Sequence, residues 1–89
     1  MKIIKPHYYA FFSVEGGINL KTPMKFSNQD FARRGVRKET QVHLPEGGNA
    51  TWSVHLPDGT AIIAGGWRNG VQYRTPDSDL HLHNRPEIE

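Results

Sequence analysis

The chain has 89 residues, a formal net charge of +2 and no cysteine. This length allows one domain with a modest core, and the absence of cysteine excludes a disulfide scaffold and thiolate chemistry. The first six residues lack the apolar run of a signal peptide, and no segment is apolar for long enough to span a membrane. We therefore expect a soluble, cytoplasmic protein without a membrane partner.

The charge is unevenly placed along the chain. Residues 1–74 hold ten Lys and Arg against five Asp and Glu, a balance of +5, whereas residues 75–89 hold one Arg against four acids, a balance of −3. A basic body is compatible with an acidic protein, a nucleoprotein complex or nucleic acid as partner. The acidic tail also allows a simpler interpretation, in which it screens the charge of the body.

Residues 2–14 are rich in aromatic and β-branched side chains and predict a strand, which a Glu-Gly-Gly turn joins to a return strand over 18–26. A three-residue loop at this turn sets Phe12 opposite Leu20. One face of this N-terminal hairpin is then apolar and suited to the core. The other face carries two aromatic rings that need a cover, Tyr9 and Phe11.

The segment after the hairpin predicts a short helix. Ser27 suits an N-cap and Gly35 suits a stop, so we expect a helix of about two turns near residues 28–34. Phe31 would then lie over the uncovered rings of the hairpin.

The middle of the chain repeats one pattern. Val-His-Leu-Pro-acid-Gly occurs at residues 42–47 and again at residues 54–59. Pro-acid-Gly favours a turn, so each copy predicts the end of a strand followed by a hairpin loop. With glycine at the bulge position of both loops, the two turns select the same buried face, and Trp52 lies opposite Ala64. The buried face of this meander holds Val42, Ala50, Trp52, Val54, Ile62 and Ala64.

The histidines of the repeat, His43 and His55, lie on the opposite, polar face and are expected to face solvent. The register separates them by roughly 20 Å at about 3.3 Å per residue. They are therefore not predicted to form a metal site or an acid–base pair.

After the repeat, Gly65-Gly66 predicts a bulge and Asn69-Gly70 predicts a type I′ hairpin with a short return strand. The elements together predict an all-β or β-dominated α+β domain over residues 1–76, with about six antiparallel strands. Their order is the N-terminal hairpin, the one short helix and a four-stranded meander, arranged as a small barrel or a sandwich.

Residues 77–89 predict a polar, acidic C-terminal tail. Only residues 80–83 alternate as a short strand would. Residues 84–89 are polar and interrupted by Pro86, so the fold is expected to tolerate their deletion.

The densest charge lies at Arg33, Arg34, Arg37 and Lys38, four cations within six residues. One interpretation is a solvated helix end, where cations also suit the helix dipole. The other is a contact with phosphate or with an acidic surface. The excess of arginine over lysine favours bidentate recognition.

Trp67 and Arg68 precede the Asn69-Gly70 turn and form a second candidate for partner binding. Trp and Arg are enriched at binding hot spots and stack on bases. Alternatively, Trp67 folds back onto the sheet near Ile63.

A weak metal candidate lies near the C-terminus. His81 and His83 share one face if their segment is a strand, and Glu87 follows. The string His-x-His-x-x-x-Glu resembles the metal-binding motif of cupins, but the glycines that flank the cupin motif are missing. No cofactor is therefore expected.

No catalytic motif is present: the sequence lacks a Gly-x-Ser-x-Gly elbow, a phosphate-binding loop and a dinucleotide fingerprint. The chain therefore favours a small, non-enzymatic binding protein that acts stoichiometrically on a macromolecular partner. Its size suits a phage or mobile-element accessory protein that inhibits a host nucleic-acid machine. Two alternatives stay open: a nucleic-acid-binding module, and a metal-independent ribonuclease toxin that uses histidine for acid–base catalysis.

Overall fold

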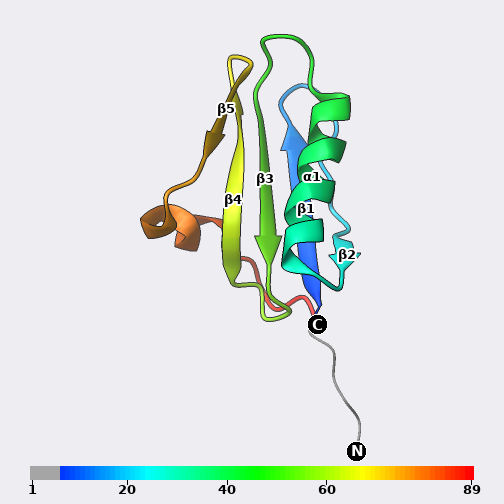
Figure 1. Ribbon diagram of the computed structural model, residues 1–89, viewed down its shortest axis with the longest axis vertical. Coiled ribbons are helices and arrows are strands. Elements are labelled where there is room, and N and C mark those ends of the chain that lie inside the picture. Colours follow the sequence, from blue (N-terminus) through cyan, green and yellow to red (C-terminus); the bar gives the residue numbers. More distant parts are fainter. Residues whose placement is uncertain (1–6) are drawn as a thin grey trace, which may run out of the picture.

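The computed structural model describes residues 7–89. Five strands form one open antiparallel sheet in the order β2-β1-β3-β4-β5, with one α-helix packed on it (Figure 1). The elements in chain order are β1 (Tyr8–Val14), β2 (Met24–Phe26), α1 (Gln29–His43), β3 (Ala50–His55), β4 (Ala61–Arg68), β5 (Val71–Arg74) and a 3-10 helix, η1 (Asp77–His83).

The prediction of a mostly β domain with some helix is confirmed, but the sheet has five strands rather than six and does not close into a barrel. Within residues 7–89, neither helix is long and apolar enough to cross a membrane.

The N-terminal hairpin has the predicted register at its turn. Leu20 N donates to Phe12 O at 2.9 Å, as expected for residues that face each other. Further from the turn the pairing shifts by two residues, so that Ala10 pairs with Met24. A two-residue shift keeps every side chain on its predicted face. The predicted strand begins at Tyr8 within the described residues, and its first part, residues 2–6, lies outside them.

Helix α1 is twice as long as predicted and begins after a different cap. The side chain of Asn28, not Ser27, accepts hydrogen bonds from the backbone N–H groups of Asp30 and Phe31. Gly35 does not end the helix. A Cβ at Gly35 would lie 2.8 Å from the ring of Phe26, so this glycine allows the ring to approach the helix backbone.

The predicted first strand of the meander is wrong, because residues 40–43 belong to α1. Every fourth residue of this helix is buried (Ala32, Val36, Thr40), as expected for the inner face of a helix. This burial favours the helix over the strand that the local pattern predicts. Val42, predicted to be buried, is 69% exposed. The helix ends at His43 and Leu44 is extended, because Pro45 disfavours the helical conformation of the residue before it.

The place of the missing strand beside β3 is taken by β1, so that Phe12 pairs with Trp52. The hairpin between β3 and β4 has the predicted loop, with Leu56 N donating to Thr60 O at 2.9 Å. A register shift next to Val54 then sets Trp52 opposite Gly65 instead of Ala64.

The predicted bulge at Gly65-Gly66 is therefore misplaced. Gly65 instead allows the indole ring of Trp52 to pack against the backbone of β4, since a Cβ there would lie 2.9 Å from that ring. The turn at Asn69-Gly70 is as predicted, with φ of 52° and 79° at its two residues.

The core lies between the sheet and α1. It holds Ala10, Phe12, Val14, Ala32, Val36, Ala50, Trp52, Val54, Ile63 and Trp67. Trp52 is buried as predicted, whereas Ile63 takes the place expected for Ile62 because of the register shift.

The C-terminal segment covers part of the other face of the sheet. The guanidinium carbon of Arg85 lies 3.7 Å from the ring centroid of Phe11, and the Tyr9 hydroxyl donates to the Glu89 carboxylate. Phe31, the predicted cover, is 60% exposed on the outside of α1. Residues 80–83 lie in η1 and do not form the predicted strand.

Candidate functional site

A groove runs along the side of α1 that faces β5. The helix packs on β1, β2 and β3 and leaves the same face of β4 and β5 uncovered (Figure 1). The groove has a volume of about 300 Å³. We call it the arginine groove, and it is lined by Arg33, Arg37, Trp52, Ile63, Gln72, Tyr73 and Arg74.

Two elements supply its cations. Arg33 and Arg37 lie one helical turn apart on α1, so their side chains leave the helix on the same side. Arg74 comes from β5 across the groove. In the amide orientation that satisfies both groups, the Gln72 carboxamide oxygen accepts from Arg37 Nη2 at 2.6 Å and from Arg37 Nε at 3.0 Å. This pair holds the guanidinium of Arg37 in place.

The negative charge beside the groove is small. Asp30 accepts from Arg33 Nη2 at 2.7 Å and from Arg34 Nη2 at 2.8 Å, so one carboxylate serves two guanidinium groups. The hydrogen bond from Arg33 lowers the pKa of Asp30 and keeps it ionised. Over residues 7–89, Arg37 and Arg74 have no carboxylate within ion-pair distance. The groove therefore has an excess of positive charge.

Trp52, one of the residues that line the groove, carries an unsatisfied hydrogen-bond donor. Trp52 is 4% exposed, and its indole Nε1 has no hydrogen-bond partner among the described residues. A buried donor without a partner costs about 1–3 kcal/mol.

The groove continues toward the N-terminus of α1. A hollow of about 720 Å³ shares Arg33, Ile63 and Arg74 with it and extends past Asn28 and Tyr8. The available length therefore suits an extended segment better than a small compact ligand.

Only two of the four predicted cations line the groove. All four of them lie within α1, rather than at the end of a short helix. Arg33 and Arg37 line the groove, whereas Arg34 and Lys38 are exposed and do not.

The two residues of the second candidate, Trp67 and Arg68, also lie in different surroundings. Trp67 is 7% exposed and packs in the core, which is the folded-back alternative. Arg68 is exposed and lies over the ring of Tyr73, with its guanidinium carbon 5.4 Å from the ring centroid.

The sequence reasoning missed Trp52 Nε1, Gln72 and Arg74 as site groups. Alternation along the hairpin after Asn69-Gly70 sets Gln72 and Arg74 on one face, which is a usable signal. No local signal showed that this hairpin lies beside the helix.

The predicted metal residues do not come together. His81 and His83 lie in η1, where side chains two residues apart diverge because the helix has three residues per turn. Residues 7–89 contain no group of three His, Cys, Asp or Glu that could hold a metal ion.

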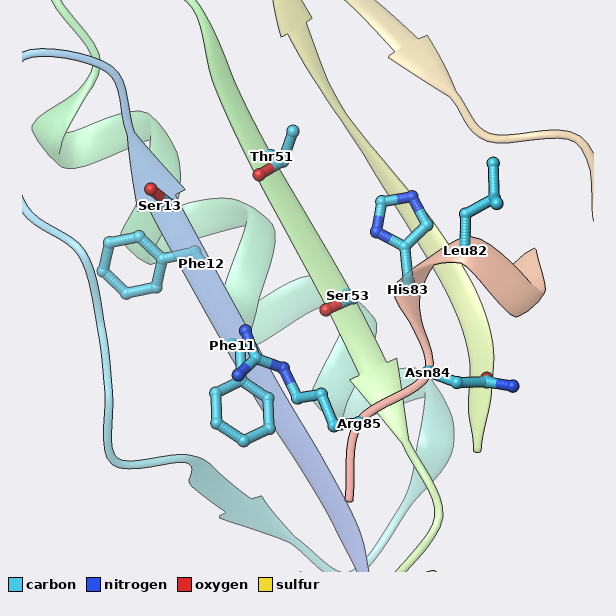
Figure 2. Close-up of a pocket in the computed structure, with 9 residues that line it drawn as sticks. All are labelled: Phe11, Phe12, Ser13, Thr51, Ser53, Leu82, His83, Asn84 and Arg85. Atoms are coloured by element: carbon cyan, nitrogen blue, oxygen red, sulfur yellow. The ribbon is translucent and has the colours of Figure 1, made fainter. Parts of the chain in front are cut away.

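A second hollow lies on the opposite face of the sheet, where the C-terminal segment crosses β1 and β3 (Figure 2). We call this hollow of about 270 Å³ the tail pocket; it is lined by Phe11, Phe12, Ser13, Thr51, Ser53, Leu82, His83, Asn84 and Arg85. Figure 2 shows Arg85 reaching from the C-terminal segment across to Phe11. Its guanidinium is thereby held against an aromatic ring.

His55 lies behind the tail pocket and is fully buried, contrary to the predicted solvent-facing position. Its Nδ1 lies 3.0 Å from Gly59 O, and its Nε2 lies 2.7 Å from Ser53 Oγ. A carbonyl only accepts, so Nδ1 carries the proton and Nε2 accepts from the Ser53 hydroxyl. Burial lowers the pKa of His55 and keeps the ring neutral. Both ring nitrogens already have protein partners.

Comparison with protein-family models, with curated proteins and with solved structures found no match to this chain.

Proposed function

We propose that this protein is a non-enzymatic binding module that acts stoichiometrically on an acidic macromolecular partner through the arginine groove. The observation that carries the proposal is a groove lined by three arginines, two of which have no carboxylate within ion-pair distance among residues 7–89. Trp52 also lines this groove, and its buried indole N–H has no partner among the same residues. Buried polar groups in folded proteins nearly always have a partner. An acidic ligand would supply that partner together with the missing negative charge.

The chemistry of the lining supports binding rather than catalysis. Arginine stays protonated and cannot exchange protons at neutral pH. The other lining residues are Trp52, Ile63, Gln72 and Tyr73. The groove therefore offers donors that can hold an anion, and it offers no histidine or carboxylate to move a proton.

The two histidines of the repeated pattern give little support to the ribonuclease alternative. Both nitrogens of His55 are occupied, and the ring of His43 stacks on Phe12 with the centroids 5.8 Å apart. Neither of them lines the arginine groove.

The preferred partner is an acidic protein segment. Carboxylates can accept paired bonds from Arg37 and Arg74, and Arg37 is already ordered by Gln72, which lowers the entropy lost on binding. Nucleic acid is the second candidate, because phosphate also pairs with arginine.

The indole N–H signals of the two tryptophans provide a direct test by NMR. The Trp52→Phe variant identifies the Trp52 signal, which should move on titration with an acidic peptide while the Trp67 signal stays in place. A Trp52 signal that does not move at saturating peptide would contradict the proposal.

Salt dependence separates the two classes of partner. Binding of a single-stranded oligonucleotide that is tighter than peptide binding, and that weakens steeply as salt rises, would favour nucleic acid. Tighter peptide binding with a shallow salt dependence would favour the protein partner.

A further inference from the structure

Strand β5 forms one edge of the sheet, directly beside the arginine groove. Thr75 N donates to Ala64 O at 2.9 Å, which continues the antiparallel pairing of β4 with β5. In such a pair, alternate residues exchange backbone hydrogen bonds with the partner strand. Val71 and Tyr73 therefore bond toward β4, and the backbone N–H and C=O groups of Gln72 and Arg74 point out of the sheet.

This outer edge is open. No strand among residues 7–89 pairs with it, and both Gln72 and Arg74 are exposed. The same two residues direct their side chains into the groove. Outward backbone groups and groove-lining side chains thus belong to the same residues.

The two faces of β5 differ in chemistry. Gln72 and Arg74 lie on the face of α1, next to Arg37. Val71 and Tyr73 lie on the other face, where Arg68 covers the ring of Tyr73 and Val71 is 69% exposed. A strand added to β5 would set its own alternate side chains beside these two faces. Acidic side chains fit the first face and apolar side chains fit the second.

We propose that the partner segment is an extended peptide with alternating acidic and apolar residues, which adds to β5 as a further strand of the sheet. This inference rests on the proposed function of the arginine groove and names the ligand class. The backbone bonds to Gln72 and Arg74 provide affinity, and the alternating side chains provide specificity. Pairing of β5 with the β5 of a second copy is disfavoured, because it would bring two copies of Arg74 together in the same site.

Amide hydrogen exchange measured by NMR tests the added strand, with a short alternating Glu-Val peptide as probe. In the free protein the amides of Gln72 and Arg74 should exchange faster than those of Val71 and Tyr73. Saturating peptide should slow Gln72 and Arg74 by roughly tenfold or more, with little change at Val71 and Tyr73. If the Trp52 indole signal moves while both outward amides keep their free exchange rates, the peptide binds the groove without adding a strand.

A peptide of the same composition with its Glu and Val residues in two blocks is the matched ligand control. It carries equal charge but lacks alternation, so it should bind roughly tenfold more weakly or worse. Equal affinities would overturn the alternating pattern, and failure of both peptides to bind would overturn the proposed function itself. Dimers of the peptide-free protein that are lost on charge reversal at Arg74 would show that a second copy occupies the edge.

Discussion

Trp52 and His55 lie three residues apart on β3 and are both buried, but the hydrogen bonding of their ring nitrogens differs. Each carries a polar ring nitrogen that must leave water on folding. His55 has both nitrogens satisfied by Gly59 and Ser53, whereas Trp52 Nε1 has no partner among the described residues. The two rings thus differ in whether the cost of burying a polar nitrogen is offset by a hydrogen bond.

Replacing Trp52 by Phe should separate binding from stability. The variant removes the unsatisfied donor and keeps most of the ring packing, so we expect the free energy of unfolding to change by less than about 1.5 kcal/mol. Peptide binding should weaken, because the acceptor loses its donor. Urea unfolding and calorimetry measure the two quantities, and wild-type affinity in the variant would contradict the role of the indole. Trp52→Ala, which leaves a cavity, should cost about 3–5 kcal/mol.

The buried imidazole of His55 should make stability depend on pH. Because its pKa in the folded state is lowered, the unfolded chain binds more protons as the pH falls below the ordinary value of 6.5. The contribution of His55 to stability is thus present above that value and is lost on acidification. Melting temperatures of the wild type and His55→Gln should diverge above pH 6.5 and converge below it. Parallel pH profiles would show that His55 is not the responsible group.

At the scale of the element, turns were predictable and the length of the helix was not. The loop after Leu56 and the turn at Asn69-Gly70 depend on residues within the turn itself. The first copy of the repeated pattern contains the same turn residues, but the preceding segment belongs to α1 because Val36 and Thr40 find a buried place on the sheet. Local propensity is a weak guide where tertiary burial decides.

The candidate site was predictable to a similar extent. The cation cluster is visible in the sequence and includes Arg33 and Arg37. The contribution of Arg74 depends on the helix lying next to β5, a contact between elements far apart in the chain. The sequence offered no means of placing those elements together once the helix was expected to end at Gly35.

Replacement of Gly35 by Ala tests the close approach of Phe26 to α1. In an exposed helix this change stabilises by about 1 kcal/mol. Here the added Cβ meets the ring at 2.8 Å, and we expect a loss of about 1–3 kcal/mol. Urea unfolding measures the difference, with Gln41→Ala on the exposed side of α1 as the control. A more stable Gly35→Ala protein would mean that the ring moves away freely.

At the scale of the whole molecule, the two faces of the sheet are covered by different segments. Helix α1 covers one face over β1 to β3 and leaves the groove beside β5. The C-terminal segment covers rings on the other face and ends at Glu89, which accepts from the Tyr9 hydroxyl and lies 3.7 Å from Lys25 Nζ. The hydrogen bond to Glu89 raises the pKa of Tyr9 to about 12. The proposed binding groove and the packed C-terminal segment thus lie on opposite faces of the sheet.

Deletion of residues 84–89 should destabilise the protein, although the sequence predicted that the fold would tolerate it. The segment donates Arg85 N to Gly59 O and Ile88 N to Pro57 O, each at 2.9 Å, and Asn84 Oδ1 accepts from Ala61 N at 2.8 Å. At about 0.5–1.5 kcal/mol for each bond, we expect a loss of about 2–4 kcal/mol. The melting temperature should fall by more than about 8 °C. Glu87→Ala, in the same segment, should change it little, and a truncated protein with an unchanged midpoint would contradict the packing of the segment.

The central claim is that the arginine groove, and not the positive charge of α1 in general, binds the acidic partner. Neighbouring cations on α1 test it, because Arg37 lines the groove and Lys38 does not. Calorimetry should show that Arg37→Glu lowers affinity for an acidic peptide by roughly tenfold or more, as the loss of a charged hydrogen bond implies, while Lys38→Glu stays close to the wild type. Equal losses in the two variants would show that net charge alone attracts the peptide and would contradict the assignment of the groove.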